Sequence, residues 1–403
     1  MHFAMGWSKY NMWFLGVWPE PIKTSRAKRY ISNLIFWSTL IIVLLFVCLP
    51  INAHLFIMST NLSQIIQNLS INVPCFLAFI KQLFLRYHRK ALTLLVGQIL
   101  NDWTRPIPEA ERQAMMRNAK RSHLISILGS TVTYLLLTAF TLMSIWNNMQ
   151  FEELYSLPFP SFFPYNYKKS PNFELTWFGE TMGAIITTIC YSCFDSFVAV
   201  LTLHLCGQLA VLKINLNSLV NATRPDNFAK FQERLGFIVN RHKELYRYAT
   251  VIEDYFNITL LVQTMISTSM LCMTGYRLVT TINEGQVGAD IIFYIVHVIH
   301  VITHFFFYCY IGEQLLTESL SVTQSAYDCE WYDLPPKKAV SLTIVMMQAN
   351  VSFKLTAGKF SPFSLKLFSA VIILSPAAIT TQRIRSGVLR SQQQKAVNFT
   401  IVS

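Results

Sequence analysis

Charged residues are scarce in this chain. Asp, Glu, Lys and Arg make up 13% of its 403 residues, whereas a soluble globular domain carries about 25%. Hydrophobic residues make up 53% of the chain, and they come in long blocks. This composition excludes an ordinary soluble domain and predicts a protein with several membrane spans.

Catalytic motifs are missing as well. The sequence contains no HExxH, no GxSxG and no glycine-rich phosphate loop. We therefore expect no enzyme activity, no metal and no cofactor. None of the eight cysteines falls in a segment that we expect outside the cell, so no extracellular disulfide framework is expected either.

The net charge of +12 could suggest a nucleic-acid partner. The basic residues alternate between successive loops, however, and do not form one patch. Alternation of this kind is typical of a membrane protein, whose Lys and Arg residues stay on the cytoplasmic side. We therefore expect membrane lipid, and no nucleic acid, around this chain.

Seven apolar segments set the fold class. A helix needs about 20 mostly apolar residues to cross a bilayer, so we predict an all-α membrane protein with seven transmembrane helices. The spans are expected near 33–53, 65–85, 124–146, 181–206, 255–276, 291–311 and 361–381. The apolar stretch 339–353 is too short to cross and is expected to pack as a helix on the cytoplasmic side.

Lys and Arg residues fix the expected orientation. The segments expected inside hold 24 of them, and the three intervening loops hold three. The N terminus is therefore expected in the cytoplasm, and seven spans put the C terminus outside. The chain divides into an N-terminal arm (1–32), a six-helix bundle (33–311), a cytoplasmic anchor segment (312–360), a seventh span (361–381) and a tail (382–403).

A few polar residues lie within the expected spans. His297, His300 and His304 share one face of the sixth span, because they are three and four residues apart. They form either a polar seam between helices or part of a cavity wall, with His297 best placed for the cavity. We disfavour a metal site because no carboxylate or cysteine lies nearby in sequence. Asp195 must be paired or face water, since an isolated charge inside a bilayer is costly.

The loop 147–180 is rich in proline and aromatic residues. Prolines stiffen a loop, and aromatic rings favour the membrane interface. The loop is expected to be either an ordered cap over the bundle or a lid over a hydrophobic pocket, and its composition fits both. Its prolines and aromatics include Tyr155, Pro158, Phe159, Pro160, Phe162, Phe163, Pro164, Tyr165 and Tyr167.

The stretch 306–360 carries a set of short motifs in a fixed order. They are Tyr308-Cys309 with Gly312-Glu313, then Glu318-Ser319, then Trp331-Tyr332 with Leu334-Pro335, and finally Leu355-Thr356-Ala357-Gly358-Lys359-Phe360. Together they resemble the C-terminal signature of the insect odorant receptor family. The resemblance implies seven spans with a cytoplasmic N terminus, as the charge pattern predicts.

The resemblance also implies an odorant pocket among the outer halves of spans 2, 3, 4 and 6. The residues expected there are apolar or aromatic with a few polar groups, which suits a small volatile hydrophobic ligand. They are Val73, Phe76, Thr138, Met143, Trp146, Met182, Ile185, Tyr191, Phe293, Tyr294 and His297.

The signature itself is implied to serve assembly, and the seventh span to line a pore. The residues implied in assembly are Glu313, Trp331, Tyr332, Leu334, Pro335, Gly358, Lys359 and Phe360. Those implied along the pore are Leu365, Phe368, Val371 and Ile372, whose apolar character fits a constriction gated by dewetting.

The resemblance therefore implies an odorant receptor. The chain would be the tuning subunit of an odorant-gated, non-selective cation channel, because it lacks the longer cytoplasmic loop of the odorant coreceptor. Its partner would be that coreceptor, in a tetrameric hetero-oligomer at the plasma membrane of olfactory sensory neurons.

The match breaks off after Ile372. The tail contains Pro376, which would kink or end the seventh helix, and several basic residues that oppose placement outside. The tail resembles the product of an alternative exon or a read-through. Two alternatives stay open: a gustatory-type receptor channel with the same topology, and a non-conducting variant.

Overall fold

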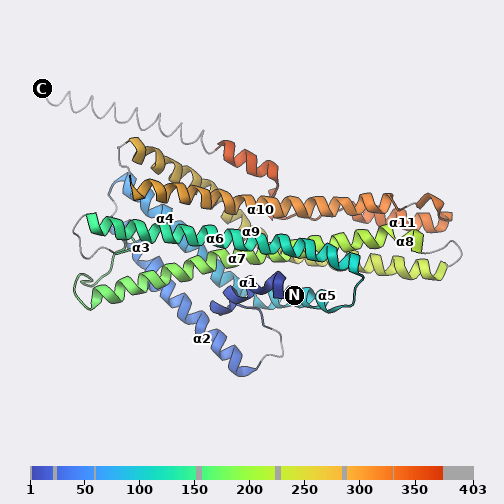
Figure 1. Cartoon of the computed structure of the whole chain (residues 1–403), viewed down its shortest axis with the longest axis horizontal. Coiled ribbons are helices and arrows are strands. Elements are labelled where there is room, and N and C mark those ends of the chain that lie inside the picture. Colours follow the sequence, from blue (N-terminus) through green and yellow to red (C-terminus); the bar gives the residue numbers. More distant parts are fainter. Residues whose placement is uncertain are drawn as a thin grey trace, which may run out of the picture.

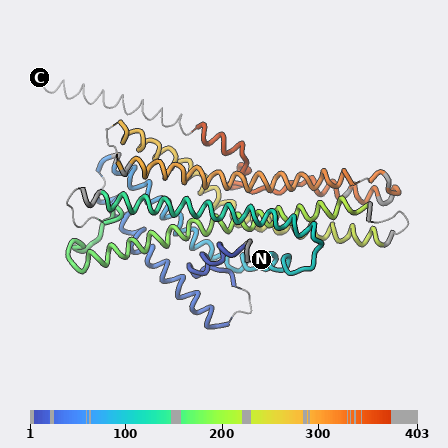
Figure 2. Tube along the Cα trace, viewed as in Figure 1, coloured from blue at the N-terminus to red at the C-terminus, as the bar shows by residue number. Residues whose placement is uncertain are grey.

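A computed structural model describes residues 2–20, 25–58, 60–150, 157–222, 228–283, 288–329 and 331–374. Long helices run side by side along the longest axis of the molecule (Figure 1). At one end α6 and α9 finish and α7 and α10 begin, and α11 lies at the opposite end (Figure 2). We call the latter the α11 end.

The N-terminal part contains the shorter helices. Short α1 (His2–Phe14) packs against α6 and α7, and Trp7 Nε1 donates a hydrogen bond of 2.8 Å to Ser130 Oγ. The first span is continuous but irregular: α2 (Arg26–Val43) passes through a π-helical turn, Leu44–Cys48, into α3 (Leu49–Ile57). Pro50 follows this turn, and a proline within a continuous helix removes one backbone hydrogen bond, which accounts for a local irregularity of this kind. α4 (Leu62–Tyr87) and α5 (Arg89–Thr104) complete this part.

Four helices are longer than a bilayer is thick. They are α6 (Glu109–Gln150), α7 (Asn172–Asn217), α9 (Phe228–Asn283) and α10 (Ala289–Tyr327). The 46 residues of α7 measure about 69 Å at 1.5 Å per residue, against about 30 Å of hydrocarbon core. α7 therefore extends beyond the predicted span 181–206 at both ends, and short α8 (Leu219–Ala222) follows it.

Six helical segments in the described part of the chain are long and apolar enough to cross a membrane. They are Arg26–Ile57, Gln64–Tyr87, Glu109–Trp146, Asn172–Asn217, Lys230–Asn283 and Ile291–Tyr327. Each contains one of the first six predicted spans. The prediction of a multi-span helical membrane protein is confirmed in fold.

Helix α7 forms the centre of the bundle. It contacts α1, α2, α4, α6, α9 and α10, and 78% of the residues in its most apolar 18-residue stretch are buried. Phe194, Phe197 and Val198 of α7 are fully buried in the core. Small residues elsewhere on α7, such as Gly183 and Ala199, let neighbouring helices approach closely.

The C-terminal region folds back along α10. A short 3₁₀ turn (Trp331–Asp333) leads into α11 (Pro336–Ala349), which packs on α10. The short helix predicted within 339–353 is therefore present. Strands β1 (Thr356–Ala357) and β2 (Ser361–Pro362) form a small antiparallel hairpin before a C-terminal helix, Leu365–Leu374.

This C-terminal helix is the described part of the predicted seventh span 361–381. It begins at Leu365, because the hairpin occupies the preceding residues. The end of that span and the whole tail 382–403 lie outside the described residues.

Candidate functional site

A cavity of about 120 Å³ lies among α4, α6, α7 and α10, towards the end away from α11. Its wall is mostly carbon, with hydroxyl and imidazole groups at a few points. The lining residues are Ser70, Ile71, Pro74, Cys75, Thr133, Leu136, Leu137, Phe140, Phe159, Ala184, Thr187, Thr188, Tyr191, Phe293, His297 and His300.

One of these residues comes from the loop between α6 and α7. Phe159 is buried, and its ring stacks on Phe140 with 5.0 Å between centroids. Its backbone N–H donates a 3.2 Å hydrogen bond to the Glu180 carboxylate, and Phe162 N donates at 3.0 Å to Pro50 O. The described part of the loop is therefore an ordered cap over the cavity. Tyr155 lies outside the described residues.

The structure brings three of the predicted ligand-binding residues to this wall: Tyr191, Phe293 and His297. Others lie nearby without lining it: Val73, Met182 and Ile185 are partly buried, Met143 packs beside Phe140 and Phe293, and Tyr294 accepts a hydrogen bond from Arg277. Phe76, Thr138 and Trp146 are exposed on the outside of the bundle.

Sequence reasoning missed most of the wall. Leu136, Leu137 and Phe140 lie at helical spacing on one face of α6, so their periodicity was an available signal. For Phe159 the only signal in the sequence was the high aromatic content of its loop. Pro74 lies inside the continuous helix α4 and lines the cavity, and a proline inside a span was a second usable signal.

Two histidines of the wall have unused hydrogen-bonding groups. His297 and His300 are 4% and 6% exposed. Nδ1 of His297 and both ring nitrogens of His300 have no hydrogen-bond partner among the described residues. Buried polar atoms normally have partners, so these atoms mark the polar part of the cavity.

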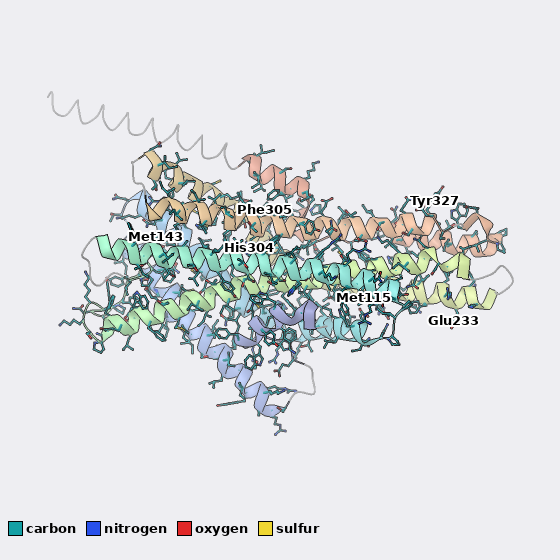
Figure 3. The ribbon with its side chains drawn as sticks, viewed as in Figure 1. Met115, Met143, Glu233, His304, Phe305 and Tyr327 are labelled. Atoms are coloured by element: carbon teal, nitrogen blue, oxygen red, sulfur yellow. The ribbon has the colours of Figure 1, made fainter. Side chains whose placement is uncertain are left out.

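His304, the third histidine of the row, belongs to a network around Asp195. Its Nδ1 lies 2.6 Å from Asp195 Oδ2, and its Nε2 lies 2.9 Å from Thr133 Oγ1. Lys81 Nζ and Tyr308 Oη donate to Asp195 Oδ1 at 2.7 and 2.5 Å. Figure 3 shows His304 in the middle of the bundle. Asp195 is thus paired, as an intramembrane carboxylate requires.

Lys81 was the member that sequence reasoning missed. Its side chain is fully buried, and Nζ lies 3.8 Å from the ring centroid of Tyr191, a cation–π contact that adds to the ion pair. A lysine inside the apolar span 65–85 was a sufficient signal, because such residues face the bundle interior and have a partner. Tyr191 joins the two regions: it lies under Lys81 and also lines the cavity.

The described residues do not favour a metal at the histidine row. Nowhere in the described ranges are three His, Cys, Asp or Glu side chains grouped so as to hold a metal ion. Both nitrogens of His304 already face Asp195 and Thr133. The chemistry available at the cavity is non-covalent: apolar contact, aromatic stacking and hydrogen bonding.

A second polar network joins α5 to α7 and α9. Asp102 accepts a 3.1 Å hydrogen bond from His204 Nε2 and one of 2.7 Å from Arg241, which also donates to Gln208. Burial by itself raises the pKa of Asp102, but His204 and Arg241 outweigh it and hold that pKa below its usual value.

The predicted assembly residues lie at two places: Glu313, Gly358, Lys359 and Phe360 lie near the start of the C-terminal helix, and Trp331, Tyr332, Leu334 and Pro335 lie between α10 and α11. Glu313 of α10 accepts a hydrogen bond of 3.2 Å from the backbone N–H of Leu365. Gly358, with φ +60°, donates to Asn257 O at 2.9 Å, and Lys359 lies 3.4 Å from Asp254. Pro335 precedes α11, and Trp331 and Leu334 are partly buried. In contrast, Tyr332 and Phe360 are 70% and 84% exposed.

The predicted pore residues lie on the C-terminal helix. Phe368 packs against Phe305 and Phe306 of α10, with centroids 6.0 and 5.4 Å apart. Val371 is buried and Ile372 partly so, whereas Leu365 is 42% exposed. One face of this helix therefore packs on α10, and the opposite face is exposed among the described residues.

Known proteins resemble this chain over most of its length. A sequence model of the 7tm Odorant receptor family matches residues 61–375. Odorant receptor 13a of Drosophila melanogaster is 24% identical over 94% of this chain and 93% of its own. The Odorant receptor coreceptor of the same species is 32% identical, but over 39% of this chain and 32% of its own.

The fold is shared with a solved structure. The insect olfactory receptor OR5 from Machilis hrabei, in complex with eugenol, superposes with a TM-score of 0.80 at 12% identity, covering 94% of this chain and 99% of that one. The fold, the family match and the homologues agree. The chain belongs to the 7tm odorant receptor family.

Proposed function

We propose that this chain is the odorant-binding, tuning subunit of an odorant-gated cation channel that it forms with the odorant coreceptor. The observation that carries the proposal is the capped, mostly apolar cavity among α4, α6, α7 and α10. A cavity of about 120 Å³ is close in size to the engineered ~150 Å³ protein cavity that binds benzene. The ligand is therefore a small hydrophobic volatile.

The comparisons support the tuning role. The likeness to an odorant receptor extends over 94% of this chain, while the likeness to coreceptors covers 37% to 39% of it. The related Machilis hrabei receptor has been solved with a small molecule, eugenol. The match to odorant receptors also makes the gustatory-type alternative the weaker one.

The exposed surfaces support assembly with a partner. Phe360, in the hairpin before the C-terminal helix, and Tyr332, in the 3₁₀ turn before α11, are large, exposed aromatic side chains. Exposed apolar groups of this kind are typical of protein or membrane contacts. In the proposed channel they contact neighbouring subunits, and the exposed face of the C-terminal helix lines the pore at the plasma membrane of olfactory sensory neurons.

The test is whole-cell recording from cells that co-express this chain and the coreceptor, across a panel of volatiles. Odour-evoked current that is absent with the coreceptor alone is the expected result. Surface labelling of the same cells separates failed delivery from failed function. Silence across a broad panel despite delivery would contradict the proposal and favour the non-conducting variant.

A matched pair of substitutions ties the current to the cavity. Leu137 lines the cavity, whereas Leu135 is 56% exposed on another face of α6. Leu137→Trp fills the cavity and is expected to raise the half-activating concentration more than about tenfold, since each ~1.4 kcal/mol of lost binding is tenfold. Leu135→Trp is the control and is expected to respond like the wild type.

A further inference from the structure

The polar wall of the cavity identifies the chemical class of its ligand. Resting on the function proposed above, we infer that the cavity selects volatiles that carry a hydroxyl group, alcohols or phenols, over hydrocarbons of the same skeleton. His297 and His300 supply this selectivity. The argument depends on which polar groups of the wall are already used and which are not.

The hydroxyl groups of the wall are mostly used. Ser70, Thr133, Thr187 and Thr188 each donate to a carbonyl oxygen one turn earlier in their own helix, at 2.7 to 2.8 Å. Such a bond uses the single hydroxyl proton. These side chains therefore present no proton to a ligand.

The two histidines differ from these hydroxyls because their hydrogen-bonding groups are not used within the chain. His297 Nδ1 and both nitrogens of His300 have no partner in the described chain, although both side chains are more than nine-tenths buried. A neutral imidazole carries one N–H donor and one acceptor nitrogen. Together the two rings offer a donor and an acceptor to a molecule in the cavity.

The neighbouring rings contact His300 without forming a hydrogen bond to its nitrogens. Its ring lies 4.5 Å from that of His304, whose nitrogens face Asp195 and Thr133, and 5.6 Å from that of Tyr191. The Tyr191 hydroxyl accepts a 2.7 Å hydrogen bond from Gln263. His300 therefore contacts two rings, while both of its nitrogens have no hydrogen-bond partner in the described chain.

A hydroxyl group matches this pair better than a carbonyl, an ether or a hydrocarbon does. It donates one hydrogen bond and accepts others, so it meets an imidazole nitrogen and an imidazole N–H at once. A carbonyl or ether oxygen meets only the N–H. A hydrocarbon leaves both unsatisfied, and a site built to hydrogen-bond its ligand strongly rejects an analogue without the group. The rest of the molecule contacts Leu136, Phe140 and Phe159.

The test compares pairs of ligands with one skeleton, such as cyclohexanol and methylcyclohexane, or phenol and toluene. Half-activating concentrations are measured on the full receptor with the coreceptor. The wild type is expected to prefer the hydroxyl member at least about tenfold, the size of one lost hydrogen bond in a buried site. His300→Phe keeps a ring and removes the nitrogens, and is expected to bring the ratio close to one.

His300→Gln and His297→Phe sharpen the result. Glutamine restores a donor and an acceptor, so His300→Gln is expected to recover part of the preference, while His297→Phe reduces it. Surface labelling of each variant establishes delivery. A wild type without a preference, or a His300→Phe variant that keeps the full preference, would overturn the inference.

A second readout separates this inference from the proposed channel function. Thermal unfolding of the purified full chain is measured with each ligand pair, because a ligand that binds the folded state raises its melting temperature. If the hydroxyl member raises the melting temperature but evokes no current, the proposed channel function is contradicted and the inferred hydroxyl site is supported. If both members evoke the same current and raise the melting temperature equally, the proposed channel function is supported and the inferred hydroxyl site is contradicted.

Discussion

His300 and His304 are one turn apart on α10, and their surroundings are opposite. Both nitrogens of His304 are engaged, by Asp195 and by Thr133. Both nitrogens of His300 are unpartnered in the described chain, and the residue lines a cavity. Residue type and burial are the same, so the difference lies in what the neighbouring helices bring. A buried polar group stabilises the fold where partners are present, and is available for recognition where they are missing.

The strongest test of this contrast removes the centre of the satisfied network. Asp195→Leu leaves Lys81 and His304 buried without a carboxylate, and breaking a buried ion pair costs about 3–5 kcal/mol. Surface delivery is expected to fall to near background, and the melting temperature of the purified protein to drop sharply.

Two matched variants accompany that change. Asp195→Asn keeps the hydrogen-bonding capacity and should be milder. Adding Lys81→Met to Asp195→Leu removes the uncompensated lysine and is expected to recover part of the loss. Normal delivery of Asp195→Leu would show that the network does not stabilise the bundle.

The second test makes the same substitution at both histidines. His304→Phe deprives Asp195 and Thr133 of a partner, which costs about 1–3 kcal/mol. His300→Phe removes only unpartnered nitrogens and is expected to be delivered as well as the wild type. Melting temperature and surface labelling are measured for both variants. Equal decreases in the two variants would contradict the different roles that we assign to His300 and His304.

The third test examines the close packing at the join between α10 and the C-terminal helix. A Cβ on Gly312 would lie 2.5 Å from Phe363 Cβ and 2.5 Å from its backbone oxygen. Gly312→Ala therefore pushes the segment before the C-terminal helix off α10, at about 1–3 kcal/mol, and is expected to reduce co-precipitation with the coreceptor. Gly236→Ala in α9 is the control, because nothing lies within 4 Å of its added Cβ.

The smallest effect concerns the Asp102 network and pH. Because the pKa of Asp102 is held down in the folded state, the group contributes stability above its unfolded pKa of about 3.9. That contribution is lost as pH falls through the lower, folded pKa. Acid is therefore expected to lower the melting temperature, and Asp102→Asn to weaken this dependence; an unchanged dependence would count against the pairing with His204 and Arg241.

Much of the fold could be predicted because span length and charge distribution are properties of single segments. The six spans and the short helix α11 follow from them. The need to pair Asp195 followed from the cost of a buried charge, but its partners come from α4 and α10, and only packing brings them together. Lys81 was overlooked although its position inside a span marked it.

The cavity wall was harder to predict. Knowing that Phe76 and Trp146 lie in the expected outer halves of their spans does not say which way each helix is turned, and both side chains face outwards. Helix rotation depends on contacts with neighbours far away in sequence. Phe159 enters the wall from a loop, where no periodicity indicates direction.

Helix α10 has one further property. It runs without a break from the cavity at His297 to Glu313, which holds the first N–H of the C-terminal helix. The 16 steps from His297 to Glu313 measure about 24 Å at 1.5 Å per residue. One continuous helix therefore connects the cavity wall directly to the start of the segment that we propose lines the pore.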